Sequence, residues 1–192
     1  MSWKIERWLS GVFPGKDKIY SEYRLLPRRE LAVVAAAVLD IALAELLSRR
    51  LLGQTKEYEE FLGLNGDGRA PCGSLGARIQ LALLVGIITD HDAAVLRSVK
   101  NIRNRLAHRV LCDFNSPEVL PLVVSLHDLF LARSNKLIDE GLLGGTKHDL
   151  ELLRPLLTST PEVGAALLLA ILTVYQAYFH RLSETVSRIA PI

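Results

Sequence analysis

Apolar residues recur with the spacing of an α-helix along nearly the whole sequence, and no stretch shows the two-residue alternation of a half-buried strand. β-branched residues are scattered among Leu and Ala, which favour helices. Helix start signals recur as well, with a capping residue, Pro and Glu in order at Ser116-Pro117-Glu118 and Thr160-Pro161-Glu162. The sequence therefore predicts an all-α fold, a single helical bundle of about seven helices in which neighbours are mostly antiparallel.

Length and composition indicate one domain. A chain of 192 residues with 49% hydrophobic and 23% charged residues can bury a core without disulfides or metal ions. With only 13 Gly and 8 Pro, the composition excludes intrinsic disorder and a collagen-like chain. No internal repeat and no long flexible linker divides the sequence, so we expect residues 1–192 to form a single domain.

Two long apolar runs, Leu31 to Leu47 and Val163 to Phe179, have the composition of helices that are hydrophobic nearly all round. The second run is close to the minimum length that crosses a hydrocarbon layer about 30 Å thick. Polar residues interrupt both runs, among them Asp40 and Glu45 in the first. We therefore expect buried helices and no membrane span, with an apolar helix face through which the chain forms a homodimer.

The cysteines and histidines predict neither a metal site nor a disulfide framework. Cys72 and Cys112 lie far apart and form no C-x-x-C motif, which favours reduced thiols. The histidines have no ligand spacing such as H-x-x-x-H, so we expect no metal and no other cofactor. Together with the absence of a secretory signal pattern in the sequence, this predicts a cytoplasmic protein.

The segment from Thr89 to Val110 has the clearest amphipathic pattern in the chain. Its apolar positions gather on one arc of a helix: Val95, Leu96, Val99, Ile102, Leu106, Ala107 and Val110. Arg103 falls inside this arc, and burying a lone guanidinium costs several kcal/mol or more. We therefore predict that Arg103 forms a structural ion pair with Asp40 or Glu45.

The other side of the same predicted helix carries the one basic patch of a chain whose net charge is only +2. Asn and His alternate there with Arg along a stripe that faces solvent or a partner. The predicted binding or interface residues are Arg97, Asn101, Asn104, Arg105, His108 and Arg109.

Within this segment, Arg103-Asn104-x-x-x-His108 resembles the R-x4-H motif of HEPN helical domains, some of which are metal-independent RNA endonucleases. The resemblance implies that Arg103, Asn104 and His108 act as catalytic residues on RNA. However, residues five apart on a regular helix diverge by about 140°. This divergence favours a structural role for Arg103 and an interface role for His108.

A longer stretch, residues 31–110, resembles the mannitol operon repressor (MltR) family. The resemblance consists of a long apolar helix, a Gly-rich loop, a helix that ends in Gly-Ile-Ile and a helix with an R-N-x-x-A-H box. The matching pieces are Phe61 to Gly68, Gly73 to Leu75, Gly86 to Ile88 and Arg103 to His108. It implies an all-helical fold and a repressor-like role in transcription regulation through contacts with another regulatory protein, since the family has no recognised module for direct DNA binding.

Two functional hypotheses follow. The preferred one is a cytoplasmic, non-enzymatic MltR-like regulator that binds proteins, because the MltR resemblance is longer than the HEPN-like motif. The alternative is a HEPN-like metal-independent RNA endonuclease or toxin component.

Overall fold

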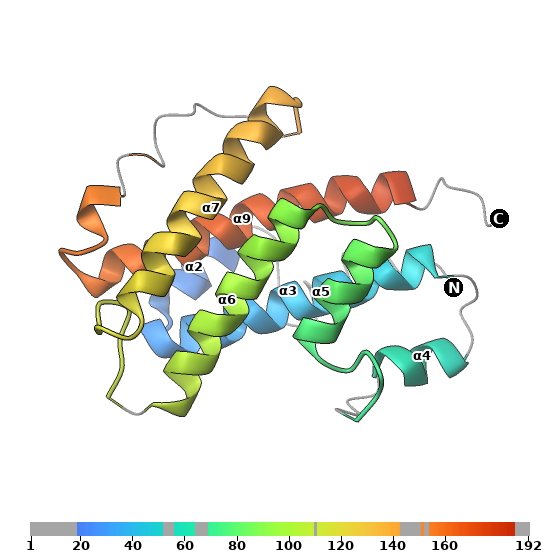
Figure 1. The fold of residues 1–192 in the computed structure, drawn as a ribbon, viewed down its shortest axis with the longest axis horizontal. Coiled ribbons are helices and arrows are strands. Elements are labelled where there is room, and N and C mark those ends of the chain that lie inside the picture. The colour runs from blue at the N-terminus through green and yellow to red at the C-terminus, as the bar shows by residue number, and fades with distance from the viewer. Residues whose placement is uncertain are drawn as a thin grey trace.

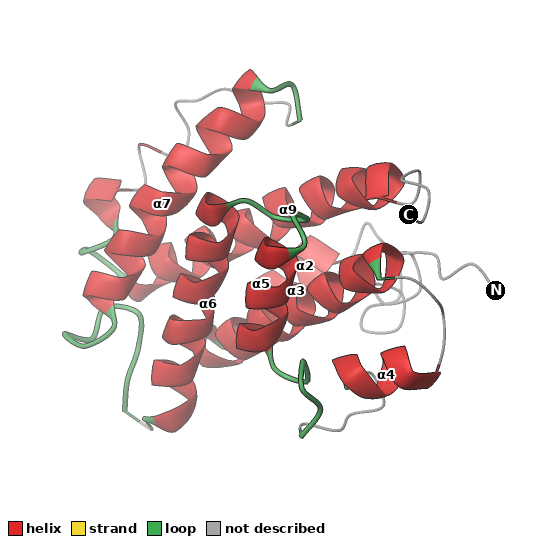
Figure 2. Cartoon of the chain, turned by 45° about the vertical axis from the view of Figure 1, so that its right-hand side comes forward, coloured by secondary structure: helices red, strands yellow, loops and turns green. Residues whose placement is uncertain are grey.

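The computed structural model describes residues 19–51, 56–63, 69–109, 111–142, 151 and 154–186. Within these ranges the regular structure consists of seven α-helices and a 3-10 turn, without a strand (Figure 2). The predicted all-α fold is therefore confirmed. The elements are α2 (Ile19–Leu25), α3 (Arg28–Arg50), α4 (Lys56–Leu62), α5 (Leu75–Leu84), α6 (Asp90–His108), α7 (Leu120–Asp139), η2 (Arg154–Leu156) and α9 (Pro161–Val186).

The helices form two layers. The long helices α3 and α9 pack against each other in one layer, and α5, α6 and α7 cover them in the other (Figure 1). Successive helices α5, α6 and α7 run antiparallel, as their short connections predict. In contrast, α3 and α9 run in the same direction (Figure 1), which is possible because the rest of the bundle lies between them in the sequence.

The two apolar runs form the centre of the bundle. By length and composition alone, Arg28–Arg50 of α3 and Pro161–Thr185 of α9 could each cross a membrane. In the folded chain, 61% and 50% of their most apolar windows are buried by other parts of the protein. Their hydrophobic character is thus used largely in packing the core.

A polar side chain caps the start of α5, whereas α3 and α7 begin without a side-chain cap. Ser74 caps α5 by accepting a hydrogen bond from the N–H of Ala77. α9 begins at Pro161, as predicted. The predicted start at Ser116 is wrong, because the carbonyl of Ser116 accepts hydrogen bonds in a turn and α7 begins only at Leu120.

Candidate binding site at the end of α6

The buried arc of α6 largely follows the sequence pattern. Five of the predicted positions are almost completely buried: Val95, Leu96, Val99, Ile102 and Leu106. Ala107 is exposed, so its assignment to the core was wrong, and Val110 lies outside the described residues. Burial of this arc turns the opposite side of the helix outward.

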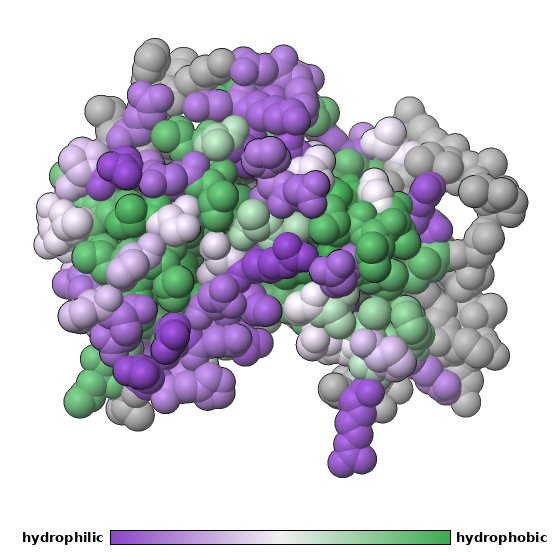
Figure 3. All heavy atoms as spheres, in the orientation of Figure 1, coloured by the Kyte–Doolittle hydropathy of each residue, from purple (hydrophilic) through white to green (hydrophobic). Residues whose placement is uncertain are grey.

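The exposed side of α6 carries a polar pocket near the C-terminal end of the helix. The pocket has a volume of about 470 Å³ and its described lining residues are Asn101, Asn104, Arg105, His108, Arg109 and Leu122. All but Leu122, which comes from α7, were predicted as binding residues. The first four are spaced at i, i+3, i+4 and i+7, which places them on one helix face. Hydrophilic side chains form a band over α6 in Figure 3.

Arg97 is the predicted binding residue that does not line this pocket. It is exposed on α6, one helical turn before Asn101. Its Nη2 donates a hydrogen bond to Oε1 of Gln80 at 2.8 Å, which ties the side chain toward α5. Arg97 is therefore an exposed, positively charged residue on the same helix as the pocket, but it is not among the residues that line the pocket.

Arg103 approaches the pocket only through Asn104. Its Nη1 donates a hydrogen bond to Oδ1 of Asn104 at 2.9 Å. Within the part of the chain that the structure describes, its Nε is buried without a hydrogen-bond partner, and Arg103 is not among the residues that line the pocket. The two ends of the R-x4-H motif thus differ in position, since His108 is exposed and lines the pocket.

The predicted ion pair between Arg103 and Asp40 or Glu45 is wrong. Nη1 of Arg78 on α5 lies 2.7 Å from Oδ1 of Asp40, and Glu45 pairs with Arg49 one helical turn away. Burial raises the pKa of Asp40, against the lowering effects of Arg78 and, more weakly, of the Arg103 charge. Among the described residues, Arg78 on α5 therefore forms the ion pair with Asp40 that we predicted for Arg103 on α6.

A side chain from α3 anchors the end of α6 beside the pocket. Nε and Nη2 of Arg29 donate hydrogen bonds to the carbonyl oxygen of Leu106 at 3.1 and 2.8 Å. The last carbonyls of a helix lack partners within the helix and carry partial negative charge. Arg29 satisfies one of them with a cation and fixes the position of the helix end.

Arg109, the last basic residue of the site, is partly neutralised. Its Nη1 lies 3.1 Å from Oε1 of Glu118, which also accepts a hydrogen bond from Sγ of Cys112 at 3.0 Å. The bond from the thiol and the charge of Arg109 both lower the pKa of Glu118. The same bond to the carboxylate raises the pKa of Cys112, so this thiol stays protonated near neutral pH.

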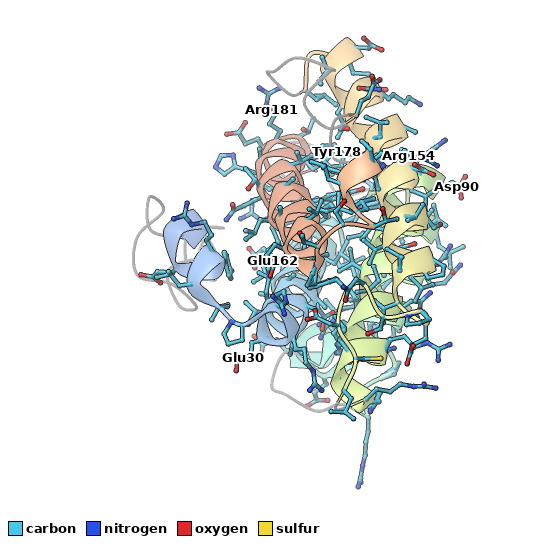
Figure 4. The ribbon with its side chains drawn as sticks, turned by 90° about the vertical axis from the view of Figure 1, so that its left-hand side faces the viewer. Glu30, Asp90, Arg154, Glu162, Tyr178 and Arg181 are labelled. Carbon is cyan, nitrogen blue, oxygen red and sulfur yellow. The ribbon has the colours of Figure 1, made fainter. Side chains whose placement is uncertain are left out.

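The sequence interpretation missed a buried polar network around Asp92. Thr89 and Asp92 form a capping box at the start of α6, and Asp92 also pairs with Arg133 of α7. The hydroxyl of Tyr175 donates to Oδ1 of Asp92 at 3.1 Å, and Tyr178 accepts from Nη2 of Arg133 at 3.0 Å. Burial and the negative charge of Asp92 raise the pKa of Tyr178 to about 12. Tyr178 lies in the interior between α9 and α7 (Figure 4).

A signal for this network was present in the sequence of α7. Arg133 follows Leu126 and Phe130 and precedes Leu137 with helical spacing, so it occupies the core face of its helix. A guanidinium at such a position requires an acid on another helix. Finding that this acid is Asp92 required the packing of α6 against α7.

A second, mainly apolar pocket of about 750 Å³ lies along α7 and includes the polar side chains of His91, Ser125 and Asp128. Asp128 is held by Arg154 at 2.8 Å and by Nδ1 of His127 at 3.2 Å. Arg154 stands beside α7 in Figure 4. The carboxylate of this pocket is therefore already engaged by two residues that do not line it.

Comparison of the chain with protein-family models, with curated proteins and with solved structures finds no match. The part of the chain that the structure describes contains no group of three His, Cys, Asp or Glu side chains placed to hold a metal ion. What the pocket at the end of α6 offers chemically is a set of hydrogen-bond donors and positive charges on a solvent-open surface.

Proposed function

We propose that this chain is a cytoplasmic, non-enzymatic regulator of the MltR type, which acts by binding another protein through the pocket at the end of α6. The observation that supports this proposal is the convergence of Asn101, Asn104, Arg105, His108 and Arg109 on one open pocket, while Arg103 stays outside it. The pocket thus offers groups that bind a partner, and the arginine of the R-x4-H motif is not among them.

The position of Arg103 weighs against catalysis. Cleavage of a phosphodiester by an arginine and a histidine requires both groups within hydrogen-bond reach of one phosphate. Here the guanidinium of Arg103 is directed to Asn104 and His108 lies on the pocket wall. A binding role uses the polar side chains where they are and requires no rearrangement of α6.

Site-specific photo-cross-linking in the native cells tests the proposal. A benzophenone amino acid replaces Leu122, which lines the pocket, or Leu84, which is 73% exposed at the end of α5 and outside the pocket. We expect a discrete protein adduct from position 122 that is absent from position 84. Equal adduct patterns at both positions, or none at 122, would contradict a protein-binding role for this pocket.

RNA cleavage is the second candidate function. The hydrogen bond from Arg103 to Asn104 favours it, because it joins two of the three motif residues and the third, His108, lines the same pocket as Asn104. The test incubates mixed RNA with wild-type protein, His108→Ala and Arg97→Ala in the presence of a chelator. We expect no cleavage. If the wild type and Arg97→Ala cleave RNA and His108→Ala does not, the regulator proposal is wrong and the chain is a nuclease.

A further inference from the structure

We infer that the pocket at the end of α6 binds an acidic segment of the partner protein, a short extended peptide whose carboxylates meet Arg105 and His108. This inference rests on the proposed protein-binding function and adds the chemistry of the partner. It derives from the charges, the hydrogen-bond partners and the dimensions of the pocket.

The basic side chains of the pocket are unequally engaged. Arg109 pairs with Glu118 on the exposed rim. Within the described residues, neither Arg105 nor His108 takes part in an ion pair or a side-chain hydrogen bond, and no carboxylate lines the pocket. The N–H groups of Arg105 are therefore open to an incoming carboxylate, which the planar guanidinium can hold with two parallel hydrogen bonds.

The end of a helix normally repels an anion, because its free carbonyls carry partial negative charge. At this site Arg29 donates two hydrogen bonds to the carbonyl of Leu106 in the last turn of α6. A second guanidinium, that of Arg103, lies beside Asn104. These two arginines counteract the helix dipole, so the potential around Arg105 and His108 favours a negatively charged ligand.

The two asparagines suit a peptide backbone. Oδ1 of Asn104 accepts the hydrogen bond from Arg103, which leaves the amide N–H2 as the free end of this side chain. From Asn101 to His108 the helix rises about 10 Å, which equals the length of about three residues of extended chain. Leu122 adds one apolar contact on the α7 side. The pocket thus matches a segment with acids on both sides of an apolar residue.

RNA fits this lining less well. Single-stranded nucleic acids are bound by basic grooves in which aromatic side chains stack on the bases. The described lining has no aromatic residue, and its apolar contact is a leucine. A carboxylate peptide requires only the cations, amides and leucine that are present.

Nuclear magnetic resonance titration of the full-length, isotope-labelled protein tests the inference. The probe is the capped peptide Glu-Glu-Leu-Glu-Glu, and the comparison ligands are Lys-Lys-Leu-Lys-Lys and penta-uridylate, which has as many negative charges as the acidic peptide. We expect saturable shifts of the Asn101 and Asn104 side-chain amides and of the His108 ring, with a Kd of about 1 mM or lower. The lysine peptide should produce no saturable shift.

Matched charge reversals on one helix locate the binding site. Arg105→Glu changes an exposed cation in the pocket, whereas Arg97→Glu makes the same change outside it. We expect Arg105→Glu to raise the Kd about tenfold or more and Arg97→Glu to raise it less than about threefold. Arg105→Gln, with an expected intermediate effect, serves if the reversed charge prevents folding.

Three results would overturn the inference: shifts that do not map to the pocket, equal weakening by Arg97→Glu and Arg105→Glu, or tighter binding of penta-uridylate than of the acidic peptide. The two experiments distinguish a failure of this inference from a failure of the proposed function. A protein adduct at position 122 without peptide binding would refute the acidic segment alone. Peptide binding without such an adduct would refute the regulator function and leave the carboxylate site.

Discussion

Asp92 of α6 and Arg133 of α7 form an ion pair in the interior, with Nε of Arg133 2.6 Å from Oδ1 of Asp92. The side chain of Arg133 is 2% exposed and that of Asp92 is 0% exposed. Asp92→Ala would leave this buried guanidinium with only the more distant Glu140, 3.8 Å from its Nη1, as an opposite charge among the described residues, and would remove the capping box of α6. We expect the free energy of unfolding to fall by about 3–5 kcal/mol. Urea denaturation followed by circular dichroism measures this loss.

The double variant Asp92→Asn with Arg133→Met is the control, because it removes both charges and retains similar side-chain volumes. We expect it to be less destabilised than the sum of the two single variants by about 1–3 kcal/mol. If the loss in the double variant equals the sum of the losses in the two single variants, the interaction between the two charges does not stabilise the fold.

Arg78 holds the loop before α5 against the core. Its side chain is buried and donates to the carbonyls of Leu62 and Cys72 while its Nη1 pairs with Asp40. For Arg78→Met we expect a loss of about 3–5 kcal/mol in the free energy of unfolding. We also expect a higher pKa of Asp40, because the Arg78 charge that opposes the effect of burial in the wild type is absent from this variant. Chemical denaturation and a carboxyl-carbon NMR titration of Asp40 measure the two effects.

Arg97→Met is the matched control for Arg78→Met. Among the described residues, this exposed arginine makes one side-chain hydrogen bond, to Gln80, so its loss should change stability by less than about 0.5 kcal/mol. Comparable losses in the two variants would contradict the bridging role of Arg78.

Gly164 of α9 lies in close contact with Phe114. A Cβ at position 164 would lie 2.7 Å from Cβ and 2.8 Å from Cγ of that ring. We therefore expect Gly164→Ala to destabilise the protein by about 1–3 kcal/mol, although alanine favours a helix over glycine. Gly76→Ala in α5 is the control, since its new Cβ would meet only the flexible end of Lys100 at 3.3 Å. Thermal denaturation should show a stabilisation of about 0.5–1 kcal/mol for this variant.

Asp128 provides a pH-dependent prediction. Hydrogen bonds from Arg154 and His127 lower its pKa to about 2 in the folded state, from about 3.9 in an unfolded chain. The ionised carboxylate therefore contributes stability above about pH 4, and this contribution is lost as the pH falls to about 2. Because the pair is exposed, the contribution is small. A carboxyl-carbon NMR titration should show the pKa of Asp128 rising in Arg154→Gln, and an unchanged value would contradict the pairing.

The sequence predicted the fold well because the signals for it are local. Helical periodicity, the Thr89 and Asp92 capping box and the Thr160-Pro161-Glu162 start each depend on neighbouring residues. The pocket lining was predictable for the same reason, since one face of a single helix supplies most of it.

Partners across helices could not be predicted in the same way. Arg103 lies at the border of the buried arc of α6. At such a position a helical-wheel projection cannot distinguish a side chain in the core from one that turns toward Asn104. The choice of Arg78 as the partner of Asp40 depends on how α5 and α6 are each placed on α3, a property of the tertiary arrangement.

The parallel packing of α3 on α9 has a consequence for the newly made chain. These helices provide the largest apolar surfaces of the bundle, yet more than half the sequence separates them. During synthesis, α3 leaves the ribosome long before its main packing partner exists. Until α9 has been made, the apolar surface of α3 must be covered by a chaperone to prevent aggregation. The yield of folded protein should therefore depend on chaperone capacity, even though the finished fold is stable.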